Sequence, residues 1–334
     1  MSQQNIIQVS KLRYPFDKAP VNLFLSLVDY RNNYFTSNDP RKIMEFYKGF
    51  ESREELIEWM RERPKGSSYI YEVEGDKDII VVIPTADYDG NYSRNCRENI
   101  FKGLHIIFVE SGVGNYYFNY AHNCNVGIRK AMEYDPKWIV VSNDDVYKID
   151  DIDILKGQLL ALPQKDSTIV YLEPPGKYYS YWAFIGKPST LRRLFYLLNR
   201  YLRLRIRIEK EYARILGLKF LVFGTNIPYR FLVKHDLKFR NVGGFVIFNR
   251  KLAEEKQGNI FDETYINGTE DVDFSLQIAG ANIKVNTINY KIGCHIGASL
   301  GKSTSNRTLR DIITLAYFNQ KISEGSLKLP YENR

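Results

Sequence analysis

The sequence predicts an α/β fold with a mostly parallel central sheet flanked by helices, preceded by an N-terminal helical extension. Three apolar runs, at 79–83, 104–109 and 138–141, have no polar face. Strands of this kind are typical of parallel sheets that are covered by helices on both sides. The segments between the runs suit helices, so the chain follows a strand–helix–strand–helix–strand order.

The predicted N-terminal helical extension covers residues 1–75. Asn38-Asp39-Pro40 and Ser52 are favourable helix starts. Ser52-Arg53-Glu54-Glu55 has the pattern of a capping box, in which the Ser side chain accepts a hydrogen bond from the Glu55 amide. This extension contains no catalytic pattern, so we expect it to serve packing or assembly.

The remaining elements follow in the order expected of one large domain. Helices are predicted at 93–102 and 116–134, strands at 168–172 and near 283–287, and a further helix that opens at Thr269 after a Gly-Gly-Phe segment at 241–248. We therefore predict a core over 76–304, interrupted by a basic and aromatic insertion at about 176–240. A C-terminal helical tail, 305–334, completes the chain.

Composition excludes several classes of protein. The three cysteines, Cys96, Cys124 and Cys294, are widely spaced and form no Cys-x-x-Cys pair, which argues against a disulfide framework or a zinc site. The first residues lack the pattern of a signal peptide. The longest apolar runs are far shorter than the roughly 20 residues of a membrane span. We therefore expect a cytoplasmic protein.

One segment carries the basic character of the chain. Residues 187–219 contain ten Lys/Arg and two Glu, which accounts for the whole net charge of +8. As a helix, this segment could bind an anionic membrane surface or a lipid-linked phosphate, which would place the protein at the inner face of the membrane. The alternation of apolar residues with Arg at 202–208 also fits a strand. A solvated basic face, or a subunit contact in a homo-oligomer, explains the charge equally well.

Polar side chains follow the first three predicted strands. They are Thr85 and Asp87 after the first strand, Glu110 after the second, and Asp144 with Asp145 after the third. Ligands of open α/β sheets bind beyond the carboxyl ends of the strands. The sequence therefore predicts one crevice at this edge of the sheet.

Two acidic clusters could supply the chemistry of that crevice. Carboxylates at the end of a rigid strand, such as Asp144 and Asp145, can hold a divalent cation. Glu270, Asp271 and Asp273 open the helix that Thr269 caps, where a carboxylate could act as a base. Each cluster also fits an ordinary role, since acidic turns are common and a helix dipole favours acids in its first turn.

Taken in order, these motifs resemble those of family 2 glycosyltransferases with the GT-A fold, in particular their non-processive, rhamnosyltransferase-like members. The resemblance covers roughly 79–300. It rests on Ile83-Pro84-Thr85, Glu110, Asn125-Val126-Gly127-Ile128-Arg129-Lys130-Ala131, Asn143-Asp144-Asp145, Gly243-Gly244-Phe245, Phe261-Asp262-Glu263 and Glu270-Asp271-Val272-Asp273. Glu110 stands where Asp is more usual, and Asn143 replaces the first acid of a strict Asp-x-Asp motif.

The resemblance implies inverting, metal-dependent transfer of one sugar from a UDP-, GDP- or dTDP-linked donor to an acceptor hydroxyl on a glycan, glycolipid or protein. The resemblance also implies roles for individual residues. Asp271, beside Glu270, would remove the proton from the acceptor, and Asp145 and His295 would bind Mn²⁺ or Mg²⁺. The residues implied in donor binding are Pro84, Thr85, Asp87, Glu110, Asn125, Arg129, Asp144 and Gly244. His295 lies in a stretch rich in Gly and Ser, 293–301, and a core histidine beside a flexible loop is the equal alternative for it.

Two other functions remain open. A sugar-phosphate nucleotidyltransferase would need a Gly-rich, basic loop after the first strand, but Thr85-Ala86-Asp87-Tyr88-Asp89-Gly90 is acidic. A non-catalytic protein could bind nucleic acid through its Arg-rich segment, with an affinity that falls steeply with salt. That function would leave the ordered acidic motifs without a purpose, so we expect no nucleic-acid partner.

Overall fold

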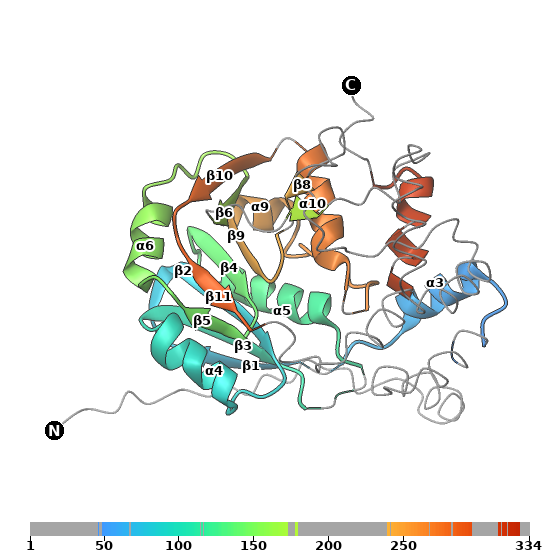
Figure 1. Cartoon of the computed structure of the whole chain (residues 1–334), viewed down its shortest axis with the longest axis horizontal. Coiled ribbons are helices and arrows are strands. Elements are labelled where there is room, and N and C mark those ends of the chain that lie inside the picture. The colour runs from blue at the N-terminus through green and yellow to red at the C-terminus, as the bar shows by residue number, and fades with distance from the viewer. Residues whose placement is uncertain are drawn as a thin grey trace, which may run out of the picture.

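A seven-stranded sheet lies at the centre of this computed structural model (Figure 1). Its strands are β1 (Tyr69–Val73), β2 (Asp76–Thr85), β3 (Leu104–Glu110), β4 (Trp138–Ser142), β6 (Thr168–Leu172), β9 (Phe245–Asn249) and β10 (Lys284–Ile288). The order across the sheet is β1-β3-β2-β4-β9-β6-β10. The strands predicted from the apolar runs are therefore confirmed, with bounds that differ by a few residues.

The structure describes residue 46 and residues 49–172, 178–179, 239–240, 242–295 and 313–327, apart from single positions within these ranges. The basic segment 187–219 lies outside the described residues, as do most of the predicted insertion and the start of the N-terminal extension. The predictions made for those segments therefore stay predictions.

Most strands of the sheet run in the same direction. β2 pairs in parallel with both β3 and β4, and β6 pairs in parallel with β10. β9 runs antiparallel between β4 and β6, and β1 runs antiparallel along the outer edge of β3. The predicted α/β class with a mostly parallel sheet is confirmed.

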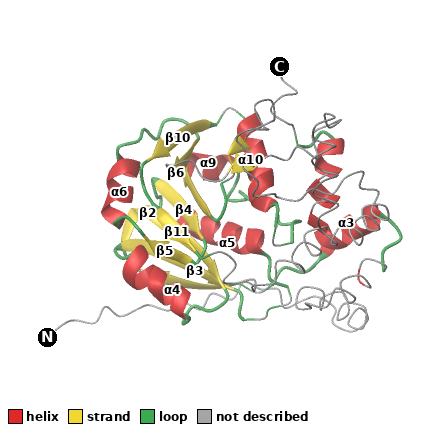
Figure 2. Cartoon of the chain, in the orientation of Figure 1, coloured by secondary structure: helices red, strands yellow, loops and turns green. Residues whose placement is uncertain are grey.

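Helices cover both faces of the sheet (Figure 2). One face packs against α5 (Tyr120–Met132), α9 (Arg250–Glu255) and α10 (Glu270–Gly280). The other packs against the π-helix at Cys96–Ile100, which continues α4 (Asn91–Asn95), and against α6 (Ile152–Leu160). Alternate residues of β2 enter the two cores, as expected for a strand that is apolar on both sides.

Gly127 allows α5 to lie unusually close to the sheet. A Cβ at this position would come 2.3 Å from a Val82 methyl group and 2.9 Å from a Val109 methyl group. Both distances are shorter than an ordinary van der Waals contact, so only glycine fits here without a shift of the helix. The close packing fixes the middle of α5 against β2 and β3.

The described part of the N-terminal extension contains one helix and one strand. α3 (Arg53–Glu62) begins as predicted, because the Ser52 side chain accepts a hydrogen bond from Glu55 N at 3.1 Å. Glu55 accepts in turn from Glu51 N at 2.8 Å. Residues 69–73, which the sequence assigned to the helical extension, instead form β1, because Ile70 enters the core and the backbone pairs with β3.

Two small sheets and a C-terminal segment complete the described structure. β5 (Val146–Lys148) pairs with β11 (Ile292–Cys294), and β7 (Tyr178–Tyr179) pairs with β8 (Phe239–Arg240). Within the predicted C-terminal tail, the described residues from 313 to 323 are helical. In the described residues, no helix has the length and apolar character needed to cross a membrane.

Candidate active site

The carboxyl ends of β2, β3 and β4 meet at one edge of the sheet. Thr85, the last residue of β2, lies beside Glu110, the last residue of β3. The Thr85 hydroxyl donates a 2.7 Å hydrogen bond to Asp144, directly after β4. Glu110 accepts from the backbone N of Tyr88 at 2.8 Å, which ties the loop after β2 to the end of β3. The predicted crevice residues of three strands are thus brought together.

Two further predicted donor-binding residues, one in β2 and one in the loop after it, also lie at this edge. Pro84 is buried within the strand beside Val109. Asp87 is exposed in the following loop, where its backbone N donates to the Thr85 hydroxyl at 3.2 Å and its side chain accepts from Asp89 N at 3.0 Å. The loop after β2 is therefore shaped by hydrogen bonds that start from Thr85.

The Asp144–Asp145 pair is closely surrounded. Asp145 is 4% exposed. Burial raises the pKa of Asp144, and the neighbouring charge of Asp145 raises it further, although the hydrogen bond from Thr85 opposes both effects. Two adjacent carboxylates are a favourable environment for a positive charge, because a cation offsets the repulsion between them.

The small β5–β11 sheet brings His295 next to Asp145. Cys294 lies opposite Val146 in this sheet, and its thiol donates to an Asp145 carboxylate oxygen at 3.4 Å. The backbone N of His295 donates to the Asp145 carbonyl at 2.8 Å. The exposed His295 ring packs against the ring of Tyr147, with centroids 4.9 Å apart. The two predicted metal ligands are thus neighbours, although they lie far apart in the sequence.

The residues at this edge fit one kind of metal binding. Within the ranges that the structure describes, no three His, Cys, Asp or Glu side chains gather as a complete metal site. Mg²⁺ is often held by only one or two carboxylates, with substrate phosphates supplying other ligands. Asp144 and Asp145 match that donor set, because they are adjacent acids at the end of a rigid strand. Such an ion would relieve the repulsion within the pair.

Asn143 joins the acidic pair to β9. Its backbone N donates to the carbonyl of Gly244 at 2.9 Å. A Cβ on Gly244 would lie 2.4 Å from the Asn143 side-chain amide, so any larger residue would have to displace that side chain. The predicted site residue Gly244 therefore lies beside the acidic pair, and close packing explains why it is a glycine.

Tyr120 contacts Asn143, directly before the first acidic cluster. Its hydroxyl donates to the Asn143 side chain at 2.9 Å. Burial raises the pKa of Tyr120 strongly, and among the smaller causes are the charges of Glu270 and Asp271. The tyrosine therefore contacts the residue before one acidic cluster and is affected by the charge of the other. Tyr120 belongs to none of the sequence motifs, and its only signal was its place in the first turn of a helix that begins at this edge.

α10 is held close to the strand edge by Ser275. This hydroxyl donates to the Asp271 carbonyl at 2.6 Å and accepts from Val242 N at 3.0 Å. Val242 shortly precedes Gly244, so the helix is fixed to the segment that contacts Asn143. Of the acids that open α10, Glu270 is 7% exposed and Asp271 is partly exposed. Asp271 is thus the more accessible carboxylate.

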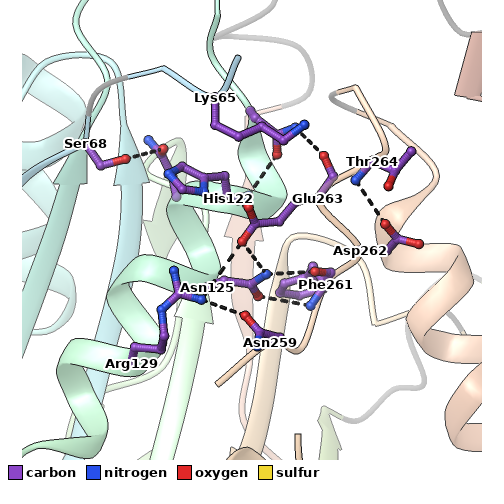
Figure 3. Close-up of polar contacts among 12 residues, drawn as sticks. Lys65, Ser68, His122, Asn125, Arg129, Asn259, Phe261, Asp262, Glu263 and Thr264 are labelled. Atoms are coloured by element: carbon purple, nitrogen blue, oxygen red, sulfur yellow. Dashed lines mark hydrogen bonds and ion pairs between the residues drawn. The ribbon is translucent and has the colours of Figure 1, made fainter. Parts of the chain in front are cut away.

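Two predicted donor-binding residues lie in a different cluster, shown in Figure 3. The Asn125 side-chain amide donates to Phe261 O at 2.7 Å and to Glu263 at 3.0 Å. Arg129 donates to the Asn259 side chain at 2.7 Å. Asn125 and Arg129 therefore bind the loop that leads to α10, and the structure does not bring them together with Thr85, Glu110 and Asp144.

His122 completes this second cluster, which we call the α5–loop cluster (His122, Asn125, Arg129, Asn259 and Glu263). His122 Nδ1 lies 2.7 Å from a Glu263 carboxylate oxygen. Burial raises the pKa of Glu263, but hydrogen bonds from His122 and Asn125 outweigh it and lower the pKa overall. No sequence motif predicts this pair, although Glu263 belongs to the Phe-Asp-Glu motif.

No protein-family model matches the chain, and no curated protein matches it.

Proposed function

We propose that the protein is a glycosyltransferase that moves one sugar from a nucleotide-diphosphate donor to an acceptor hydroxyl, with help from Mn²⁺ or Mg²⁺. The observation that carries the proposal is that Asp144 and Asp145 lie at the carboxyl edge of the sheet beside Gly244, while Ser275 fixes the acidic start of α10 to Val242, two residues before that glycine. Group transfer from a diphosphate needs charge stabilisation at the leaving group and a base at the nucleophile. The two clusters can fill these two roles.

The fold is consistent with a GT-A type assignment. Five strands of the sheet run in one direction, helices cover both faces, and β9 is inserted antiparallel next to β4. In open α/β sheets, ligands bind beyond the carboxyl ends of the strands. Thr85, Glu110 and Asp144 are gathered at that edge, where a nucleotide would lie.

In this proposal, the end of the sheet binds the donor. Pro84, Thr85, Asp87, Glu110 and Asp144 line the nucleoside, and the Glu110 carboxylate can accept a hydrogen bond from a nucleobase N–H. Asp144 and Asp145 would hold the divalent cation, which neutralises the charge that develops on the departing nucleoside diphosphate.

Asp271 acts as the base in the transfer step. Its carboxylate removes the proton from the acceptor hydroxyl while that oxygen forms a bond to the anomeric carbon. The bond from the anomeric carbon to the diphosphate breaks in the same step, and the nucleoside diphosphate departs with that electron pair. A single displacement of this kind inverts the anomeric centre. The partial exposure of Asp271 leaves room for an acceptor.

A thermal-shift screen tests donor binding. UDP-, GDP- and dTDP-sugars are added with and without Mn²⁺ to the wild-type chain, to Asp145→Ala and to Asp78→Ala. Because a ligand of the folded state raises the melting temperature, we expect one donor to stabilise the wild type and Asp78→Ala only when metal is present. Asp145→Ala should lose this response.

Asp78 is a matched control, because it lies at the opposite end of β2 and pairs with Lys137 on the surface. Equal stabilisation of wild type and Asp145→Ala, or equal stabilisation without metal, would contradict the proposed cation site. Failure of every nucleotide sugar to stabilise the wild type would contradict the proposed function itself.

A further inference from the structure

The described residues between 313 and 327, which we call the C-terminal segment, pack beside α10 (Figure 1, red). Six of them are buried: Ile313, Thr314, Ala316, Tyr317, Phe318 and Leu327. Two polar contacts join the segment to the acidic start of α10, one through Thr314 and one through Lys321. Neither residue belongs to a motif that the proposed reaction uses.

Lys321 places its ammonium group between two carboxylates. Its Nζ lies 2.6 Å from Asp273, in the first turn of α10, and 2.9 Å from Asp262, in the loop before the helix. The side chain of Asp273 is only 1% exposed, and that of Lys321 is 13% exposed. Burial lowers the pKa of Lys321, but the two carboxylates outweigh it and raise the pKa overall. The ammonium group therefore stays charged.

Two tyrosines complete the environment of this ion-pair cluster. Tyr265 donates to Asp273 at 2.7 Å, and Tyr317 donates to Asp262 at 2.9 Å. Lys321 Nζ also lies 5.7 Å and 5.6 Å from the centres of their two rings. The two rings also pack against each other, with centroids 4.9 Å apart, so both carboxylates are held by one pair of aromatic side chains with few rotatable bonds. Asp273, an acid of the predicted cluster, has a structural partner and is not available to a substrate.

Thr314 holds the residue immediately before α10 in an unusual conformation. Thr269 has a φ of 76°, in the left-handed region that β-branched residues rarely adopt. Its hydroxyl lies 2.9 Å from the hydroxyl of Thr314, which is fully buried. Strained backbone of this kind persists only where surrounding contacts hold it. Glu270 and Asp271 follow Thr269 directly, so their direction depends on this contact.

We propose that Lys321 and Thr314 are positioning residues that orient Asp271 toward the acceptor. Asp271 and Asp273 share the first turn of α10, so any rotation of that turn that moves one moves the other. Lys321 fixes Asp273 to the preceding loop through Asp262, and Thr314 fixes the backbone at Thr269. The inference rests on the proposed function, because it assigns these residues to the base of that reaction.

Steady-state kinetics with the full chain tests the proposal. We expect Lys321→Met to lower kcat by about tenfold or more, since small misplacements of a reacting group are costly, while the KM for the donor changes less than about twofold. Lys321→Arg should retain most of the activity, because it keeps the charge. Lys156→Met removes a comparable ion pair with Asp76, far from α10, and should leave kcat unchanged.

Thr314→Val provides a second test if Lys321→Met does not fold. It removes one hydroxyl and keeps the side-chain shape, so the chain should fold and kcat should fall by about threefold or more. An unchanged kcat in Thr314→Val and in folded Lys321→Met, with an active wild type, would overturn this inference alone. A rise in the donor KM with kcat unchanged would also overturn it. If the wild type transfers no sugar, that result contradicts the proposed function itself, on which this inference rests.

Discussion

Single side chains decide the role of each acid at the start of α10. Asp271 is partly exposed near Tyr120, whereas Asp273 is buried and bound by Lys321 and Tyr265. The two carboxylates are two residues apart and chemically identical, so only their surroundings separate a candidate base from a structural anion. Substitution of each by its isosteric amide therefore distinguishes the two roles.

We expect Asp271→Asn to abolish transfer while the chain stays folded and binds the donor. Loss of a general base should lower kcat by at least about 100-fold. The unfolding midpoint in urea should stay close to that of the wild type, because the Asp271 side chain is partly exposed. Turnover close to the wild-type rate would remove Asp271 as the base.

Asp273→Asn is the matched comparison and should chiefly affect stability. It leaves Lys321 with only the Asp262 carboxylate in a poorly solvated position. Loss of one partner of a buried pair costs about 3–5 kcal/mol, and the remaining Asp262 should reduce this to about 2–3 kcal/mol. Urea unfolding followed by circular dichroism measures the change. A free energy of unfolding equal to that of the wild type would show that Asp273 contributes nothing at this position.

At the scale of elements, Asn249 joins β9, α9 and β6. Its side-chain oxygen accepts from Leu252 N, which caps α9, and from Thr168 N, at the start of β6. Its amide donates to Asp166 O at 2.7 Å. The side chain is 1% exposed, so no solvent can replace these bonds. One residue thus anchors the antiparallel strand that separates β4 from β6.

We expect Asn249→Ala to lower the free energy of unfolding by about 2–4 kcal/mol. The change removes a helix cap, which contributes about 1 kcal/mol, and leaves a buried strand amide without its partner. Ser52→Ala is the control, because it removes an exposed cap of α3 and nothing else, and should cost about 1 kcal/mol. Equal losses in the two variants would contradict the bridging role of Asn249.

The contact between α5 and the sheet gives a second prediction at this scale. Gly127→Ala should lower the free energy of unfolding by about 1–3 kcal/mol, because the added methyl meets Val82 and Val109. At Gly157 in α6, the added methyl would meet open space. Gly157→Ala should therefore raise the free energy of unfolding by up to about 1 kcal/mol. Opposite signs of the two changes, measured by chemical denaturation, are the expected outcome. Stabilisation by both substitutions would contradict the tight packing of α5.

At the scale of the whole molecule, Glu72 links the sheet edge to α5. His105 Nε2 lies 2.9 Å from its carboxylate, and Tyr134 donates to it at 2.6 Å. Burial raises the pKa of Glu72, but these hydrogen bonds and the charge of Lys130 outweigh it and lower the pKa to about 2. The carboxylate thus joins β1, β3 and α5 as long as it stays ionised.

The lowered pKa predicts a loss of stability in acid. An ordinary Glu in the unfolded chain has a pKa near 4.3, so Glu72 stabilises the fold fully above that value. The contribution, at most about 3 kcal/mol, should be lost as pH falls from about 5 to 2. Glu72→Gln should show a smaller slope of unfolding free energy in this range. Glu58→Gln, on the exposed side of α3, should keep the wild-type slope, and identical slopes for both variants would contradict the prediction.

Much of the architecture followed from local pattern. The apolar runs at 79–83, 104–109 and 138–141 form β2, β3 and β4. A strand with helices on both faces of its sheet buries the side chains of both faces, so nearly all of its residues are apolar. The gathering of Thr85, Glu110 and Asp144 then followed from parallel pairing alone. The strand at residues 69–73 was harder to predict, since Tyr-Ile-Tyr-Glu-Val becomes a strand only through its pairing with β3.

The sequence by itself determined the α/β class, the order of the first strands and the edge where polar side chains collect, because hydrophobic period and strand direction are local properties. Only the tertiary structure decided which carboxylates stay accessible. Lys321 reaches Asp262 across 59 positions of the chain, and His122 reaches Glu263 across 141. No local sequence pattern predicts such pairs, because the two residues come into contact only when the chain between them has folded.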